Sequence, residues 1–170
     1  MSKKKIAVSG CLGRMGQELV KQISKDKRLD YIGGFDLKDK KTFLNNIFKK
    51  ANVVIDFSSP SSIKNNLEMA VNNNSGLVIG TTGLREKELK MLKAASKKIP
   101  ILVSSNMSLG VNLLFNLVQK TASTLSDMDY DIEIAETHHK HKVDAPSGTA
   151  LSLGEFAAKG RKINFQKSKV

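Results

Sequence analysis

Residues Lys5 to Gly16 read KIAVSGCLGRMG, and this stretch predicts the fold of the N-terminal half of the chain. Its first five residues are mostly apolar, which is typical of a short buried strand, and glycines follow at 10, 13 and 16. Apolar residues then recur at helical spacing. A strand, a glycine loop and a helix in this order predict a dinucleotide site with the pyrophosphate at the helix N-terminus. The spacing is GxxGxxG, not the commoner GxGxxG. The apolar positions are Leu12, Met15, Leu19 and Ile23.

A second predicted strand, Leu29 to Phe35, leads into an acidic residue. Asp36 lies twenty positions beyond Gly16 (36 − 16). A carboxylate placed there accepts hydrogen bonds from the hydroxyls of the adenosine ribose. An ordinary turn residue is the alternative for Asp36. Lysines follow at 38, 40 and 41 and would suit a ribose phosphate, so the sequence leaves NADH and NADPH open as cofactors.

The alternation of strand and helix then repeats. Strands are predicted over 51–57, 77–79 and 99–103, with apolar helical patterns between them. Such alternation predicts an α/β fold with a Rossmann-like parallel sheet and helices on both faces. Ligands bind such sheets beyond the carboxyl ends of the strands. The residues expected at these ends are Gly10, Asp36, Phe57, Thr82 and Asn106.

Residues 135–151 read AETHHKHKVDAPSGTAL and contain every histidine of the chain, at 138, 139 and 141. Lysines at 140 and 142 are interleaved with them, and Pro146 to Thr149 have the composition of a helix start. Protonated lysines and the N–H groups of a helix N-terminus bind anions, and imidazole exchanges protons near neutral pH. The segment therefore predicts a site for a small, doubly anionic ligand.

The segment has two other interpretations, a metal site and a solvated charged loop. On a strand, His139 and His141 would share one face, with His138, Lys140 and Lys142 on the other. Neither face then collects three ligands without a lysine beside it, so no metal is predicted. A charged loop leaves the helix start unexplained.

The composition excludes several classes of protein. The net charge of +12 suggests nucleic acid, but only four of the 28 basic residues are arginine and few aromatic residues are available for stacking. No apolar run approaches the ~20 residues that span a membrane, and the N-terminus lacks the apolar stretch of a signal peptide. Cys11 is the single cysteine, which fits a reducing compartment. A cytoplasmic location is expected.

The glycine loop, GTTG at 80–83, SSNMSLGVN at 104–112 and HHKHKVDAPSGTAL at 138–151 occur in this order. With them the chain resembles the 4-hydroxy-tetrahydrodipicolinate (dihydrodipicolinate) reductase family from about Ile6 to about Ala158. The resemblance implies an NAD(P)H-dependent reductase of diaminopimelate and lysine biosynthesis that acts on a small dicarboxylate. It also implies a dinucleotide-binding domain over 1–108 and a partial α+β substrate-binding domain over 109–170. The full-length family is expected to form homotetramers.

Roles for individual residues follow from the same resemblance. His138 matches the family's proton donor or acceptor, and Lys142 matches its second proton donor. His139, Gly148 and Thr149 match substrate contacts. The cofactor pyrophosphate would be bound by Gly10, Cys11, Leu12, Gly13, Arg14 and Met15, and the ribose by Asp36. The nicotinamide half would lie by Gly80, Thr81 and Thr82, and the reacting carbon near Ser104, Ser105, Asn106 and Met107.

Members of the family continue beyond the position of Val170, where a further strand would begin. The expectation is therefore an incomplete substrate domain with an unpaired sheet edge, and a chain that binds dinucleotide but reduces its substrate poorly. A cofactor-binding remnant without catalysis is one alternative function. Another nicotinamide-dependent dehydrogenase of amino-acid metabolism is the other, although it has no reason to carry the HHKHK segment.

Overall fold

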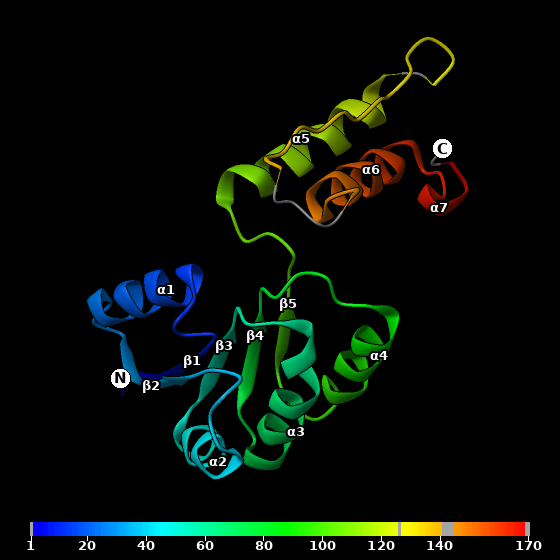
Figure 1. The fold of residues 1–170 in the computed structure, drawn as a ribbon. Helices are drawn as coiled ribbons and strands as arrows, with labels where there is room; N and C mark the ends of the chain where they lie inside the picture. Colours follow the sequence, from blue (N-terminus) through cyan, green and yellow to red (C-terminus); the bar gives the residue numbers. More distant parts are fainter. Residues whose placement is uncertain (1, 126, 141–144, 169–170) are drawn as a thin grey trace. The chain divides into compact units, whose positions relative to one another are not determined.

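The computed structural model describes residues 2–125, 127–140 and 145–168. The chain divides into two compact units, Met1–Ser104 and Ser105–Val170. Figure 1 colours the chain along its length, so that the first unit runs from blue to green and the second ends in red at α7.

The first unit is a parallel sheet of five strands in the order β2-β1-β3-β4-β5. The predicted α/β class with a Rossmann-like parallel sheet is confirmed. Strand β2 lies on one side of β1 and β3 lies on the other. The loops that follow β1 and β3 therefore run in opposite directions along the edge of the sheet. Ligands bind such sheets at this switch point. The elements are β1 Lys4–Ser9, α1 Arg14–Lys25, β2 Leu29–Phe35, α2 Lys41–Lys50, β3 Val53–Asp56, η1 Pro60–Ser62, α3 Ile63–Asn73, β4 Gly76–Ile79, α4 Glu86–Ala95 and β5 Ile101–Val103.

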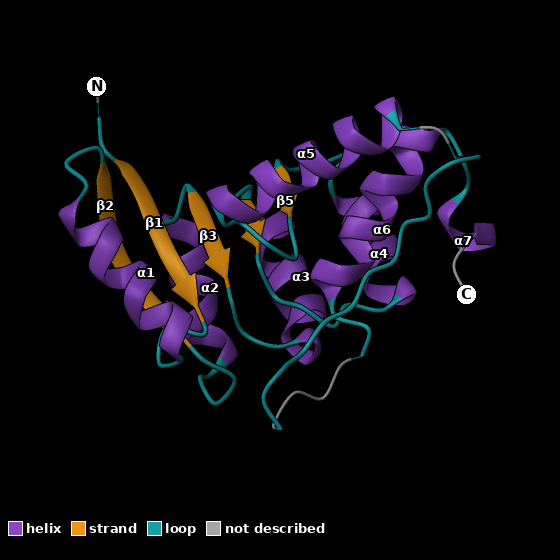
Figure 2. Ribbon diagram, turned by 90° about the horizontal axis from the view of Figure 1, so that it is seen from above, coloured by secondary structure: helices purple, strands orange, loops and turns teal. Residues whose placement is uncertain are grey.

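Helices cover both faces of this sheet because successive strand residues point to opposite sides. Ile6 and Val8 belong to a cluster that includes Ile23 of α1. Ala7 and Val54 belong to a larger cluster on the other face, built with residues of α2, α3 and α4. Figure 2 shows α1 and α2 on opposite faces of the sheet. The two apolar layers hold the strand ends, and the loops that follow them, on a rigid support.

Several details differ from the sequence prediction. Strand β3, predicted over 51–57, is limited to Val53–Asp56. Strand β5 begins at Ile101, not at Ile99, because the N–H of Ile99 donates to the carbonyl of Ala95 at the end of α4 and Pro100 has no N–H. Helix α2 was not predicted, although Leu44, Ile47 and Phe48 lie at helical spacing and are buried.

The second unit contains helices α5 Leu109–Thr124, α6 Gly148–Arg161 and the short α7 Phe165–Ser168. The rings of Phe115 and Phe156 stack with centroids 5.1 Å apart and join α5 to α6. Gly160 allows the close approach of these helices, because a Cβ there would overlap the carbonyl oxygen of Gln119. In neither unit does a described helix have the length and apolar composition to cross a membrane.

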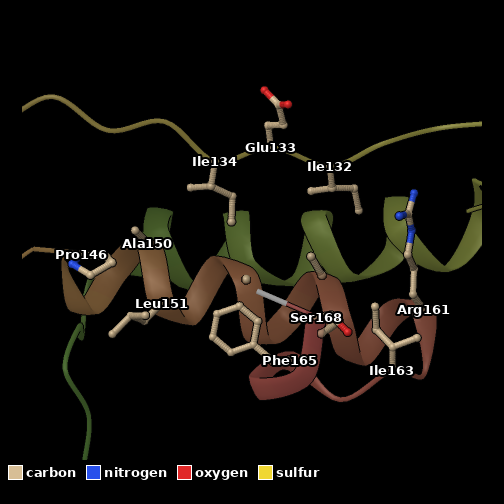
Figure 3. Close-up of a pocket in the computed structure, with 13 residues that line it drawn as sticks. Ile132, Glu133, Ile134, Pro146, Ala150, Leu151, Arg161, Ile163, Phe165 and Ser168 are labelled. Carbon is tan, nitrogen blue, oxygen red and sulfur yellow. The ribbon is translucent and has the colours of Figure 1, made fainter. Parts of the chain in front are cut away.

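An extended segment between α5 and α6 lies alongside the helices without forming a strand. In Figure 3, Ile132 and Ile134 point toward α6 and the carboxylate of Glu133 points away, as in the alternation of a strand. None of the described residues of the second unit is assigned to a strand, so the expected sheet component and the strand expected to carry the histidines are not formed as far as Lys140. A strand requires a neighbouring strand for its backbone N–H and C=O groups to pair with, and none of the described residues of the second unit forms one.

Phe48 offers a test of the larger core. It is fully buried, and its ring centroid lies 5.4 Å from that of Phe35. We expect Phe48→Ala to lower the free energy of unfolding by about 3–5 kcal/mol through lost burial and a cavity. Phe43, on the same helix but 47% exposed, is the matched control and should lose less than about 1 kcal/mol. Urea denaturation followed by circular dichroism measures both, and equal losses would contradict this packing.

Candidate functional site

The loop after β1 has a geometry that only glycine permits. Gly10 has a φ of +78°, and a Cβ there would lie 2.5 Å from the carbonyl oxygen of Phe57. A Cβ on Gly16 would overlap the carbonyl oxygen of Gly10. No side chain caps the start of α1 at Gly13 among the described residues. Amides at the N-terminus of this helix are therefore available to an anion such as a pyrophosphate.

Asp36 lies beside this loop, at the end of β2. One carboxylate oxygen accepts a hydrogen bond of 2.9 Å from the N–H of Leu12 and lies 3.6 Å from the Sγ of Cys11. Burial, followed by the hydrogen bond to Asp36, raises the pKa of the Cys11 thiol above its ordinary value. The thiol thus remains protonated and donates to the carboxylate. The structure brings Asp36 together with the predicted pyrophosphate loop.

A buried carboxylate, Asp56, joins the ends of three strands. Its Oδ1 accepts hydrogen bonds from the N–H and Oγ of Ser58, at 3.0 and 2.5 Å, and from the Oγ1 of Thr81 at 3.0 Å. Its Oδ2 accepts one of 2.8 Å from the Nδ2 of Asn66, which also donates to the Oγ of Ser9 at 3.0 Å. Asp56 and Asn66 are 1% and 2% exposed. The network links the end of β1 to the loops that follow β3 and β4.

This network changes the expectation for the GTTG loop. The hydroxyl of Thr81 is buried and also accepts from the N–H of Ser58 at 3.1 Å. Thr82 is exposed. Gly80 packs against the ring of Phe57, which a Cβ at that position would overlap. Of the two threonine hydroxyls predicted beside the nicotinamide half, that of Thr82 is the one accessible to a ligand.

In the second unit, two distant motifs meet at the start of α6. The Oγ of Ser147 caps the helix by accepting from the N–H of Ala150 at 3.0 Å. The Nδ2 of Asn106 donates to the Oγ1 of Thr149 at 3.5 Å. A Cβ on Gly148 would lie 3.5 Å from the Cβ of Ser105. The predicted substrate contacts Gly148 and Thr149 therefore lie beside residues of the SSNM motif.

Glu136 is a site residue that sequence reasoning missed. Its Oε1 accepts from the N–H of Ser147 at 2.8 Å, and its Oε2 accepts from the Oγ of Ser147 at 2.5 Å. The same Oε2 lies 3.0 Å from the Nε2 of His138. Hydrogen bonds from Ser147, and next from His138, lower the pKa of Glu136 to about 2. The signal was present as a carboxylate two positions before the first histidine.

Part of the predicted site lies outside the described residues, namely Lys142 and His141. His139 is exposed. Within residues 2–125, 127–140 and 145–168, no group of three His, Cys, Asp or Glu side chains is arranged to hold a metal ion.

A pocket of about 710 Å³ lies elsewhere in the second unit, between the extended segment, α6 and α7. Figure 3 shows its lining, in which Ile132, Ile134 and Phe165 are prominent. Glu133 and Arg161 are the charged residues among those that line it, and none of the predicted site residues does. Because it lacks all of the predicted site residues, it is not the candidate site.

The chain matches two family models along nearly its whole length. The model described as dihydrodipicolinate reductase, N-terminus, matches residues 4–107, and the one described as dihydrodipicolinate reductase, C-terminus, matches 110–170.

Proteins named 4-hydroxy-tetrahydrodipicolinate reductase are similar in sequence. That of Buchnera aphidicola subsp. Cinara cedri is 40% identical over 190 residues, which cover 99% of this chain and 69% of the relative. That of Sulfurovum sp. is 43% identical, covering 98% and 68%, and that of Rickettsia akari is 45% identical, covering 94% and 64%. The chain thus spans about two thirds of the length of these relatives.

A solved structure also resembles the fold. Dipicolinate-bound dihydrodipicolinate reductase from Paenisporosarcina sp. TG-14 superposes with a TM-score of 0.69 at 24% identity, covering 94% of this chain and 67% of that one. At this identity the likeness concerns the fold.

The lowered pKa of Glu136 predicts a pH dependence of stability. The ionised carboxylate is stabilised in the folded state, so its contribution is present above the ordinary value of 4.5 and is lost as the pH falls toward about 2. Glu136→Gln should therefore be less stable than wild type at pH 6, with the difference shrinking through this range. Urea denaturation at a series of pH values measures it. A constant difference across the series would contradict the assigned hydrogen bonds.

Proposed function

The chain belongs to the dihydrodipicolinate reductase family, and we infer that it is an NAD(P)H-dependent oxidoreductase that converts 4-hydroxy-tetrahydrodipicolinate to tetrahydrodipicolinate in diaminopimelate and lysine biosynthesis. The observation that carries this beyond sequence similarity is the cluster at the start of α6. There a histidine is hydrogen-bonded through Glu136 to an anion-binding turn. A reductase of a dicarboxylate needs both groups.

The net reaction replaces a hydroxyl group with hydrogen. The substrate, NAD(P)H and one proton give the product, NAD(P)⁺ and water, so a C–O bond breaks, a C–H bond forms and the oxygen leaves as water. NAD(P)H, when bound, supplies the hydride. The protein must then bind two carboxylates and supply a proton.

The residues of the first unit fit a dinucleotide. The left-handed backbone of Gly10, which carries no Cβ, and the uncapped start of α1 suit the close approach of a pyrophosphate. Leu12 and Met15 are 74% and 53% exposed, so their apolar side chains are available to a ligand instead of the core. These features support the roles proposed for the loop from Gly10 to Met15.

The residues of the second unit suit substrate binding and proton transfer. The N–H groups of Gly148 and Thr149 open helix α6, next to Ser147. We assign these amides, with His139 and Lys142, to the substrate carboxylates. His138 is assigned to proton transfer, with Lys142 as the second donor. A cytoplasmic location belongs to the same proposal, whereas a homotetramer is expected for the full-length family only.

The assignment of Asp36 is tested by cofactor titration. Asp36→Ala should weaken the binding of NADH more than that of NADPH, because the carboxylate accepts hydrogen bonds from the ribose hydroxyls. The binding of NADPH is also supported by lysines that attract the ribose phosphate, at positions 38, 40 and 41. Asp30→Ala removes an exposed carboxylate from the same strand and should leave both affinities unchanged. Equal losses of affinity for NADH and NADPH would show that Asp36 is an ordinary turn residue.

The assignment of His138 and Lys142 is tested by steady-state kinetics. Replacing either with Ala should remove about 3–4 kcal/mol of transition-state stabilisation, which is roughly a hundredfold to a thousandfold in turnover. Cofactor affinity should barely change. Lys140→Ala, a charge loss within the same segment, serves as the control and should retain nearly full activity. A double variant of His138 and Lys142 with wild-type turnover would refute the assignment.

A further inference from the structure

Glu136 joins two parts of the site that the proposed function treats separately. Its Oε2 lies 3.0 Å from the Nε2 of His138, and the same atom accepts the 2.5 Å hydrogen bond from the Oγ of Ser147. Its Oε1 accepts from the N–H of Ser147 at 2.8 Å. Ser147 is 5% exposed and opens α6, so one end of this arrangement is fixed to the helix.

The Ser147 end determines the direction of the hydrogen bonds. The Oγ of Ser147 accepts from the N–H of Ala150, so its proton is free to be donated to Glu136. The carboxylate therefore receives two hydrogen bonds from a single residue, which fixes its plane as well as its position. It also lies at the N-terminus of a helix, where the macrodipole favours a negative charge.

The His138 end determines which ring nitrogen is free. Hydrogen bonds lower the pKa of Glu136 to about 2, so the carboxylate is ionised near neutral pH and acts only as an acceptor. Nε2 of His138 must then carry a proton. In the part of the chain that the structure describes, Nδ1 has no hydrogen-bond partner. The ring is thus held through one nitrogen, and the other is available to a ligand.

We propose that Glu136 is the positioning residue of this site, which holds His138 through Nε2 and anchors it to Ser147, and that Nδ1 is the nitrogen that delivers a proton to the substrate. This rests on the proposed function. The proton consumed in the net reaction leaves Nδ1–H, the imidazolium becomes a neutral imidazole that keeps its Nε2–H, and the hydride comes from NAD(P)H. A second effect follows from charge. The carboxylate lies next to the turn assigned to the substrate carboxylates and repels them.

A role limited to bracing the turn makes different predictions. Loss of a brace would disturb the start of α6 and weaken binding of the dicarboxylate. Loss of a positioning residue would lower kcat without weakening binding, because the anion-binding amides remain and one negative charge beside them is gone. Glu133→Gln is the matched control. It lies three positions earlier on the same extended segment, and its carboxylate points away from α6 (Figure 3).

The experiment is a double-mutant cycle between Glu136→Gln and His138→Ala, with dipicolinate as the binding probe. In the wild-type background, Glu136→Gln should lower kcat about tenfold to a hundredfold, since a small misplacement of a catalytic group costs up to ~10²-fold. In the His138→Ala background it should lower kcat less than twofold. Calorimetry should give a dipicolinate affinity equal to wild type or tighter. Glu133→Gln should match wild type throughout.

Two results would overturn the proposal. One is a loss of kcat that persists without His138, and the other is a dipicolinate affinity that weakens in parallel with kcat. The ring nitrogen signals of His138, read by ¹⁵N NMR, provide a measurement that does not need turnover. They should show a protonated Nε2 whose signal moves in Glu136→Gln and not in Glu133→Gln, and an unchanged signal would also refute the proposal. A wild-type protein with this signature but without turnover would instead refute the proposed function.

Discussion

The buried carboxylate of Asp56 is the constraint on which the edge of the first unit that is proposed to bind the nucleotide depends. Backbone hydrogen bonds join the parallel strands to one another, but the loops beyond the strand ends are not joined in this way. Asp56 supplies it, because its four hydrogen bonds reach the loop after β3, the hydroxyl of Thr81 after β4 and, through Asn66, the end of β1. Burying a carboxylate without hydrogen-bond partners would destabilise the fold by roughly several kcal/mol. The fold therefore favours arrangements in which these donors stay in contact with Asp56.

Much of the first unit could be predicted because its pattern is local. A strand, a glycine loop and a helix are each readable over a few residues, and Gly10 does adopt the left-handed conformation that its position requires. The Asp56 network could not be predicted, because Asp56 reads as an ordinary polar residue at a strand end and Asn66 as a polar position on a helix. Their connection is a contact in space between elements, which periodicity does not encode.

In the second unit the start of α6 could be predicted, but the form of the segment before it could not. The helix start at Ser147 is a local signal, and α6 begins at Gly148 directly after its cap. The strand expected to carry the histidines depends on a neighbouring strand, which is not a property of the segment itself. The role of Glu136 depends on its hydrogen bonds with Ser147, eleven positions later in the chain, which local spacing does not encode.

The position of the Thr81 hydroxyl has a consequence for the chemistry of inhibitors. A compound designed from the sequence alone would direct an acceptor group at either threonine of the GTTG loop. At Thr81 that group would compete with Asp56 for a donor already engaged at 3.0 Å inside the protein, and it would gain nothing unless the loop rearranged. The exposed Thr82 has no such competitor in the network. For a ligand placed at this loop, as the sequence predicts for the nicotinamide half, a polar group should therefore be directed at Thr82 and not at Thr81.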